Sequence, residues 1–382
     1  CILVRMKLED FESGRWIDCF HYKCFVPSLV NRAWSWESAA LTVQLERAVR
    51  ALSALDACSR FVPDIGLFIR MHVVREASAS SRIEGTQTEM DEAVLPAEAV
   101  ARERRDDWRE VNNYVRAMDE AIAELAELPL SMRLLKKAHA RLLDGVRGRH
   151  KMPGEVRASQ NWIGGASLAT ARFIPPAVEY LPGLLSDLEF FWHNDKIEVP
   201  NLIRAAIAHY QFETIHPFLD GNGRIGRLLI PFYLISKGDL TQPCLYISDY
   251  LERHRETYYA ALSDARQRGG LLSWVSFFLT AVRETGESGC RTFQRIFKFR
   301  DEMQEYCAQK GARGGNIQRI VRHLYSHPRA TITEISTGVG LDYRTANRCV
   351  NDMVADGVLC LSAEVARNRI YDLRKYLDLF KG

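Results

Sequence analysis

The stretch His216-Pro-Phe-Leu-Asp-Gly-Asn-Gly-Arg-Ile-Gly-Arg-Leu-Leu-Ile230 organises this chain. Apolar residues recur at helical spacing before it, from Leu202 to Tyr210, and after it, from Ile225 to Ile235. A proline disfavours helical backbone at the residue before it, so Pro217 predicts that the first helix ends near His216. We therefore expect one helix to enter a polar, glycine-rich loop and a second helix to leave it.

The glycines of this loop predict an anion site. Gly221 and Gly223 flank Asn222, a combination that favours positive φ and turns several backbone N–H groups inward. A helix start carries unpaired N–H donors and partial positive charge, so it attracts phosphate. Arg224 and Arg227 oppose the helix dipole there by about 0.3–1 kcal/mol each at exposed sites, which makes sense under a multiply charged anion. We interpret that anion as a polyphosphate.

His216 and Asp220 add reactive groups to the loop. A histidine can take a proton from a hydroxyl nucleophile, and a carboxylate beside phosphates is a natural ligand of Mg²⁺. Singly, these features are more often a helix cap, a turn and a solvated face. Together, within twelve residues, they indicate phosphoryl or nucleotidyl transfer.

The same residues resemble the signature of the Fic (Fic/DOC) family, HPFxDGNGRxxR with Asp or Glu at the fifth place, at every defining position. The resemblance implies a mainly α fold, with a Fic helical core and a small β-hairpin flap. It also implies transfer of AMP from ATP to a Ser, Thr or Tyr hydroxyl of a target protein. By this resemblance each residue has a role: His216 is the catalytic base, Asp220 holds Mg²⁺, Gly221, Asn222 and Gly223 form the anion nest, and Arg224 and Arg227 grip the phosphates.

A second stretch, Ser80-Ser-Arg-Ile-Glu84-Gly85, ends a helix expected over about 64–84. A glutamate in the last helical turn opposes the dipole, so it needs solvent or a cation from elsewhere. The stretch also matches a capping box, but no apolar helical run follows it. It resembles the inhibitory motif of Fic proteins, which implies that Glu84 neutralises Arg227, so that ATP fails to bind or binds with its α-phosphate misplaced. We expect this inhibition within one chain rather than between subunits.

Two further segments resemble substrate-binding parts of the family. Residues 161–165 and 171–176 predict two strands of a hairpin, which by composition alone is equally an ordinary surface hairpin. The resemblance to the Fic flap implies that it holds a target peptide by strand addition, through Arg172, Phe173 and Ile174. Tyr258 and Tyr259 resemble an element that packs on adenine, although such a pair is more often core. Some relatives have asparagine where this chain has His254 and Arg266, which leaves the base-binding pocket open.

Residues 316–378 resemble a winged helix-turn-helix. The pattern predicts helices over 317–325, 332–337 and 343–356, a glycine turn over 338–340, and strands over 358–361 and 369–373. The third helix would carry the DNA-contacting side chains Arg344, Asn347, Arg348 and Asn351. Residues 312–382 hold 11 Lys and Arg against 7 Asp and Glu, whereas the rest of the chain holds 40 against 41. Because winged helices also dock proteins and form dimers, this weak bias leaves DNA binding, protein docking and a homodimer open.

The remaining pattern completes the domain prediction. An irregular entry from about residue 26 precedes further helices, expected over 41–55, 88–95, 105–127, 130–146 and 271–310. Gly311–Gly315 is interpreted as a linker. We predict an N-terminal helical region with the inhibitory helix (1–110), a Fic core (111–310) and a winged helix-turn-helix domain (316–382).

Composition is that of a soluble globular protein, with 47% hydrophobic and 26% charged residues among 382. Nine cysteines without a C-x-x-C pair favour reduced thiols and a cytoplasmic location. No apolar run reaches the ~20 residues of a membrane span, and no P-loop is present. Residues 1–5 precede Met6, are too short for a signal peptide and receive no function.

Three functional hypotheses follow. The first is an autoinhibited protein adenylyltransferase, and the second is a DNA-binding regulator whose Fic core only senses nucleotide. The third keeps the fold but removes AMP or transfers another phosphate-containing group. The intact signature favours the first, because a sensor needs no base at His216. The target protein, which includes the chain itself as a candidate, and the signal that relieves inhibition stay open.

Overall fold

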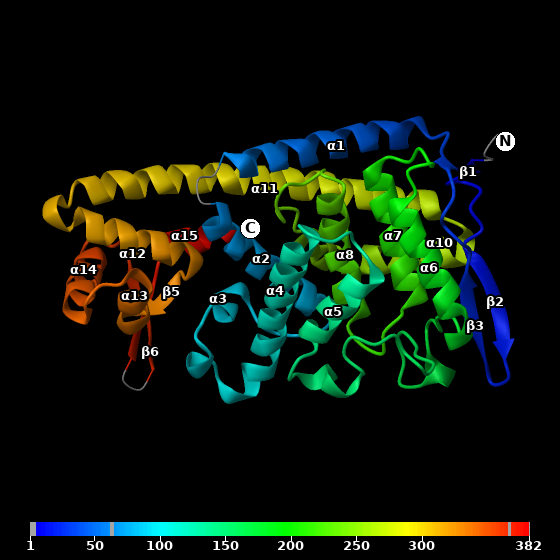
Figure 1. Cartoon of the computed structure of the whole chain (residues 1–382), viewed down its shortest axis with the longest axis horizontal. Helices are drawn as coiled ribbons and strands as arrows, with labels where there is room; N and C mark the ends of the chain where they lie inside the picture. The colour runs from blue at the N-terminus through cyan, green and yellow to red at the C-terminus, as the bar shows by residue number, and fades with distance from the viewer. Residues whose placement is uncertain (1–4, 62–64, 366–367, 382) are drawn as a thin grey trace.

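The computed structural model describes residues 5–61, 65–365 and 368–381. Helices fill most of it, which confirms the mainly α fold that the sequence predicts (Figure 1). Within these ranges no helix is both long and apolar enough to cross a membrane.

Two small sheets at the N-terminus replace part of the irregular entry expected from the sequence. β2 (Gly14–Cys19) and β3 (Tyr22–Pro27) form an antiparallel hairpin, and β1 (Met6–Lys7) pairs in parallel with β4 (Trp34–Ser35). These strands are short, and β2 has no fully buried side chain. A clean alternation of buried and exposed residues, the usual signal of a strand, is therefore missing.

The two longest helices, α1 (Ala39–Arg60) and α11 (Leu271–Ala308), lie side by side along one edge of the molecule (Figure 1). Both were predicted, and α1 continues beyond its expected end to Arg60. Gly286 lets the two backbones approach, because a Cβ there would lie 3.0 Å from the carbonyl oxygen of Ala51.

The middle of the fold is built around α7 (Asn201–Ile215), which is buried from Leu202 to Ile215 as a helix covered on every side must be. The predicted domain boundary at residue 110 falls inside α4, which runs through it without a break. Against α7 pack α6 (Leu181–His193), α8 (Asn222–Ser236) and α11. The other helices of this part pack on one another or on α8 and α11: α2 (Ile65–Ile83), α3 (Met90–Ala93), α4 (Arg105–Leu125), α5 (Met132–Leu142), α9 (Ser248–Arg253) and α10 (Arg255–Arg268). Short 3-10 turns connect them: η1 (Ala97–Ala99), η2 (Arg102–Arg104), η3 (Arg147–His150), η4 (Leu168–Thr170) and η5 (Val178–Tyr180).

The predicted flap hairpin is reduced to a single antiparallel bridge, between Ile163 and Phe173. The prediction of two strands was wrong for a local reason. Gly164 and Gly165 have φ of 69° and 75°, so the chain turns away directly after Ile163. On the other side, the prolines 175 and 176 have no N–H to continue a ladder.

The C-terminal residues form the predicted winged helix-turn-helix, with one strand more than expected. Its elements are η6 (Gly311–Arg313), α12 (Gly314–Ser326), β5 (Arg329–Thr331), α13 (Ile332–Val339), α14 (Tyr343–Ala355), β6 (Cys360–Val365), β7 (Asn368–Asp372), α15 (Arg374–Leu377) and η7 (Asp378–Phe380). The sheet has the order β5-β7-β6. The stretch Gly311–Gly315 is not a flexible linker: it turns the chain tightly, and its last two glycines already belong to α12.

Candidate active site

The predicted loop joins α7 to α8 through two residues with left-handed backbone. His216 ends α7 with φ 51° and ψ 61°, and Gly221 precedes α8 with φ 75°. Gly223, expected to help form the nest through positive φ, lies instead in the first helical turn of α8. Asn222 turns its side chain back to the loop, where Oδ1 accepts the N–H of Phe218 at 2.8 Å. First-turn N–H groups have no acceptor within their helix, so the start of α8 can bind an anion through its backbone.

Arg157 and Asn161 hold His216 in its unfavourable backbone conformation. The Nε of Arg157 donates to the His216 carbonyl oxygen at 3.0 Å, and the Nδ2 of Asn161 donates to the same oxygen at 3.1 Å. The Nη2 of Arg157 also donates to the Pro176 carbonyl at 2.5 Å. The buried Arg157 side chain therefore ties the signature loop to the base of the predicted flap.

His216 offers an unprotonated ring nitrogen. Its Nδ1 lies 3.3 Å from the carbonyl oxygen of Glu213, which can only accept, so Nδ1 carries the proton and Nε2 is an acceptor. Burial and the positive charges of Arg266 and Arg157 lower the pKa of His216 to about 3. The imidazole is neutral at pH 7 and able to take a proton.

Arg227 is held by the end of α2. Its Nη2 lies 2.6 Å from the Oε1 of Glu84, and its Nε donates to the Ser80 hydroxyl at 2.8 Å. Burial opposes ionisation of Glu84, but the Arg227 charge prevails and lowers the pKa of Glu84 below its ordinary value. Gly85, with φ 101°, lets the chain leave the helix as predicted. Two of the three predicted regulatory residues, Ser80 and Glu84, thus contact Arg227 within one chain.

Glu84 lies directly over the start of α8. A Cβ on Gly223 would be 2.2 Å from the Oε1 of Glu84 and 3.0 Å from the Nη1 of Arg227. The missing side chain of Gly223 therefore makes room for the carboxylate. Glu84 occupies the space in front of the helix start where the anion is predicted.

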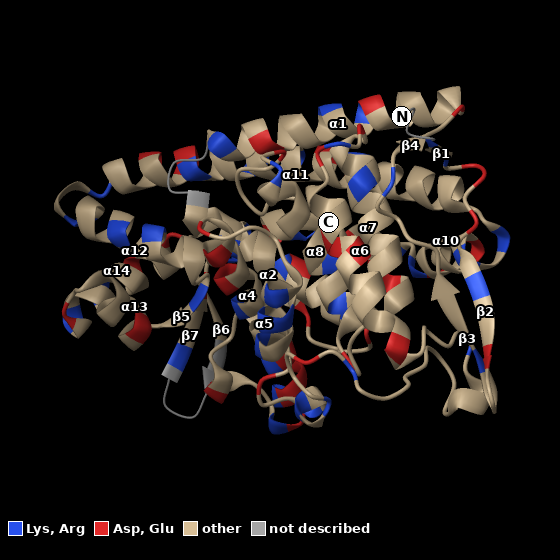
Figure 2. Cartoon of the chain, turned by 45° about the vertical axis from the view of Figure 1, so that its right-hand side comes forward, with Lys and Arg blue, Asp and Glu red and all other residues tan. Residues whose placement is uncertain are grey.

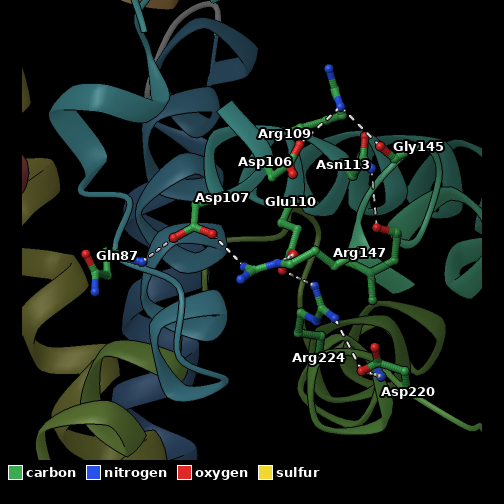
Figure 3. A network of polar contacts seen from close by, with 12 residues as sticks. Gln87, Asp106, Asp107, Arg109, Glu110, Asn113, Gly145, Arg147, Asp220 and Arg224 are labelled. Carbon is green, nitrogen blue, oxygen red and sulfur yellow. Dashed lines mark hydrogen bonds and ion pairs between the residues drawn. The ribbon is translucent and has the colours of Figure 1, made fainter. Parts of the chain in front are cut away.

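Asp220 and Arg224 face each other across the loop (Figure 3), with 3.8 Å between Asp220 Oδ1 and Arg224 Nη2. Arg224 is buried, whereas the Asp220 side chain is 44% exposed. Mg²⁺ in nucleotide sites commonly takes one or two carboxylates and fills its other positions with phosphate oxygens and water. An open carboxylate beside an anion-binding helix start fits that requirement.

Two acidic residues of α4, Glu110 and Asp107, form an ion-pair network that includes Arg224 (Figure 3). The Glu110 carboxylate accepts from Arg224 Nη1 at 3.1 Å and from Arg147 Nε at 3.0 Å. Asp107 accepts from Arg147 Nη2 at 2.5 Å and from the backbone N–H of Gln87 at 2.9 Å. The same cluster therefore touches both a signature arginine and the segment that follows Glu84.

His139 of α5 fixes the Asp220 backbone. Its Nδ1 accepts the Gly154 N–H at 2.9 Å, so its Nε2 carries the proton and donates to the Asp220 carbonyl, also at 2.9 Å. The ring stacks on Phe218, with 3.9 Å between ring centroids. Burial lowers the pKa of His139 to about 4 and keeps the ring neutral.

Sequence reasoning missed Glu110 and His139 as parts of the site. Both are buried polar residues within amphipathic helices. A polar group on such a face is costly unless it is paired, and this was the one available signal. It predicts a partner without saying which one.

The predicted flap residues lie beside the site, and part of their backbone is already paired. The N–H groups of Arg172 and Phe173 both donate to Ile163, and the Ile174 carbonyl accepts the N–H of Phe25 from β3 at 2.9 Å. The buried Phe173 ring packs 4.4 Å from the Arg266 guanidinium. The flap is thus extended by the N-terminal hairpin.

The two predicted adenine contacts separate in space. Tyr258 is fully buried and its hydroxyl lies 2.9 Å from the Nε2 of His209, so it is part of the core and the prediction for this residue was wrong. Tyr259 is 41% exposed and remains open to a ligand. His254, one of the two departures noted in the sequence, stacks on Tyr250 at the junction of α9 and α10. Arg266, the other, is buried and donates from its Nε to the Thr214 hydroxyl at 3.1 Å, and its charge lowers the pKa of His216.

Comparison with known families agrees with this geometry. Residues 42–123 match the description "Fic/DOC family N-terminal", residues 129–234 match "Fic/DOC family", and residues 315–359 match "Winged helix-turn-helix DNA-binding". The chain therefore carries the domains of the Fic/DOC family, followed by a winged helix-turn-helix domain.

Individual relatives point the same way. Over 167 residues the chain is 30% identical to the protein adenylyltransferase fic-1 of Caenorhabditis elegans, covering 41% of this chain and 30% of that protein. It is 32% identical over 160 residues to the protein adenylyltransferase Fic of Culex quinquefasciatus, covering 41% and 28%. The chain thus spans about 30% of the length of these curated relatives. A Fic family protein from Desulfovibrio desulfuricans shares the fold, with a TM-score of 0.56 at 21% identity over 88% of this chain and 96% of that one.

Proposed function

We propose that this chain is a protein adenylyltransferase that moves AMP from ATP to a Ser, Thr or Tyr hydroxyl of a target protein. One observation carries the proposal: His216 is a neutral base in the loop before α8, the same loop that holds Asp220, and Arg227 lies in the helix that follows. The names of the relatives support the same chemistry.

The reaction would proceed by in-line displacement. The Nε2 of His216 takes the proton of the target hydroxyl while the hydroxyl oxygen bonds to the α-phosphorus of ATP. The bond from that phosphorus to the bridging oxygen breaks, and diphosphate leaves with the electron pair. The first-turn N–H groups of α8 and the guanidinium of Arg227 would stabilise the growing negative charge, and removal of one such donor typically costs roughly 10²–10³ in rate.

Asp220 would hold Mg²⁺, which neutralises phosphate charge when it is bound. This chain's own contribution is to fix the ligand. His139 holds the Asp220 carbonyl, and the Gly221 N–H donates to Asp220 Oδ1 at 2.6 Å. The carboxylate is thereby oriented before a nucleotide arrives.

Glu84 would inhibit nucleotide transfer. Its carboxylate occupies the Arg227 guanidinium that a terminal phosphate of ATP needs. ATP then either fails to bind or binds with its α-phosphate out of line with the attacking hydroxyl, and both lower the rate. We assign the inhibition to the contact within one chain.

The deciding experiment compares three full-length proteins: wild type, Glu84→Gly, and Glu84→Gly with His216→Ala. Each is incubated with Mg²⁺ and α-labelled ATP, and incorporation is followed by gel and by intact mass. We expect the Glu84→Gly protein to gain the mass of AMP and the double variant to remain unlabelled. Undiminished labelling of the double variant would remove His216 from the mechanism.

We propose duplex DNA as a second ligand, bound by the winged helix domain. The observation behind it is that Arg344, Arg348 and Asn351 are exposed on α14. Lys and Arg are interspersed with Asp and Glu over the helices (Figure 2), so the proposal depends on these exposed side chains of α14 and not on a large basic face. Phosphate contacts by these arginines would make binding fall steeply with salt. A salt titration of duplex binding by wild type and by Arg344→Ala/Arg348→Ala tests this, and equal binding by both would refute it.

A further inference from the structure

The winged helix domain contacts the chain on both sides of Glu84. We call residues 80–85 the Glu84 turn and residues 314–381 the winged domain. α2 leads into the Glu84 turn and α3 follows it, and the winged domain packs beside both helices (Figure 1). The contact is therefore made to the segments directly before and after the Glu84 turn.

On the upstream side the contact is aromatic and buried. The Phe68 ring of α2 lies 4.6 Å from the Tyr325 ring and 6.1 Å from the Tyr376 ring, measured between centroids. One turn further along α2, His72 lies 4.9 Å from Phe380. All five side chains are buried, so α2 and the winged domain share one core.

On the downstream side the contact is ionic. Asp91 of α3 lies 2.6 Å from the Nζ of Lys381 and 3.4 Å from the Nη1 of Arg374. The Nη1 of Arg329 donates to the backbone carbonyl of Asp91 at 2.7 Å. Three basic residues of the winged domain thus converge on one aspartate, seven residues after Glu84.

Helix α2 connects this contact to the active site as a stiff element. From Phe68 to Glu84 the helix and its last turn span about 24 Å, at 1.5 Å per residue. Arg75 and Arg82 pin the helix to α9, with 3.1 Å to Asp249 and 2.7 Å to Glu252. Because α2 leads into the Glu84 turn and Asp91 follows it, a shift of the winged domain would act on both ends of that turn.

We propose that the winged domain holds the Glu84 turn against Arg227, so that loosening the winged domain from α2 and α3 activates nucleotide transfer. This inference rests on the proposed function, since activation is read as transfer. It assigns the winged domain a role in controlling the enzyme, whatever that domain binds. A merely structural interface would change the stability of the protein without a specific effect on Glu84.

The test uses Asp91→Asn, which removes the charge that draws Lys381 and Arg374. Asp356→Asn is a matched control: Asp356 is similarly exposed and lies 2.6 Å from Lys310. It also accepts from the Tyr306 hydroxyl of α11 at 2.7 Å, so it joins the winged domain to α11 and leaves the Glu84 turn untouched. In the full-length protein with Mg²⁺ and α-labelled ATP, we expect Asp91→Asn to raise labelling about two- to tenfold, as weakening of its three ion pairs, with Arg329, Arg374 and Lys381, allows. The control should match wild type.

Combination with Glu84→Gly separates regulation from stability. Without Glu84 no carboxylate holds Arg227, so Asp91→Asn should not change the labelling rate of the Glu84→Gly protein. An equal effect with and without Glu84, or no effect of Asp91→Asn in the wild-type background, overturns the proposal.

Amide hydrogen exchange provides a readout that does not depend on activity. We expect faster exchange over residues 80–85 in Asp91→Asn than in Asp356→Asn, with unchanged exchange in α7 as proof of folding. If Glu84→Gly is not labelled at all, the proposed function fails. Faster exchange would still support the docking, whereas unchanged exchange in the Glu84 turn overturns it.

Discussion

The Nη2 of Arg227 lies 2.6 Å from the Oε1 of Glu84, although the two residues are 143 positions apart in the chain. The arginine is 1% exposed and the glutamate 34% exposed, so the carboxylate closes the arginine off from solvent. An arginine in this position can serve the end of α2 or a phosphate, but not both at once. Under the proposed function, ATP and the Glu84 carboxylate therefore compete for Arg227.

This competition predicts a graded response at Glu84. Glu84→Gln keeps the shape but removes the charge, and a charge-assisted hydrogen bond contributes about 1.5–3 kcal/mol, or roughly 10- to 150-fold in ATP affinity. We expect Glu84→Gln to bind ATP more tightly than wild type and Glu84→Gly to bind it at least as well. Calorimetric titration with ATP and Mg²⁺ measures this. Glu89→Gln is the control, since Glu89 is exposed and pairs with Arg82 instead.

A second prediction concerns the Glu110–Arg224 pair. In the Glu84→Gly background, Glu110→Gln weakens the bond that aims Arg224, so the KM for ATP should rise roughly 10- to 100-fold. Asp106→Asn, on the same helix but in an exposed pair with Arg109, should leave the KM unchanged. If Glu110→Gln alters the rate at saturating ATP and not the KM, Glu110 does not act through nucleotide binding.

A third prediction tests the packing of α1 on α11. Gly286→Leu forces a side chain against the Ala51 backbone and should lower the free energy of unfolding by about 1–3 kcal/mol. Gly183→Ala in α6 meets no atom within 4 Å and should raise it by about 0.5–1 kcal/mol. Urea unfolding followed by circular dichroism distinguishes the two. If Gly286→Leu were as stable as wild type, α1 and α11 could move apart at this position without lowering the free energy of unfolding.

A fourth prediction is the pH dependence of transfer. Burial, followed by the Arg266 charge, lowers the pKa of His216 to about 3, so the base stays unprotonated as the pH falls from 8 to 5. The labelling rate of Glu84→Gly should therefore show no decline centred near pH 6.5. Arg266→Gln removes part of the positive charge that opposes protonation of His216. The loss of labelling rate at low pH should therefore begin at a higher pH in this variant. If the labelling rate of Glu84→Gly already fell with a midpoint near pH 6.5, this result would contradict the burial of His216.

A fifth prediction concerns stability at low pH. Burial and the Arg75 charge lower the pKa of His72 to about 3. Between pH 6.5 and about 3 the unfolded chain binds a proton at His72 that the folded chain does not, so the free energy of unfolding falls as the pH falls. His72→Phe removes this loss, which amounts to ~1.4 kcal/mol per pH unit for one proton. Urea unfolding at pH 7 and pH 5 should show a smaller difference in His72→Phe, and equal differences would contradict the shifted pKa.

The sequence was most informative where function and local geometry coincide. His216, Gly221 and Arg227 could be predicted because a helix start, a glycine with positive φ and a neighbouring base lie within twelve residues. The flap was overestimated for a local reason as well, since glycines on one side and prolines on the other stop a ladder after one bridge. Tyr258 was misassigned because a helix pattern alone does not say which of two adjacent tyrosines faces the core.

The sequence by itself determined the mainly α fold, the helix–loop–helix around His216, the turn at Gly85 and the winged helix-turn-helix. These features depend on periodicity, glycine and proline, whose effects act over a few residues. Only the tertiary structure decided that Glu110 and His139 support the site, that β3 extends the flap, and that the winged domain is seated on α2 and α3. Such contacts join residues tens to hundreds of positions apart. They depend on packing of the whole chain, because a buried polar group or an apolar face requires a partner without specifying which one.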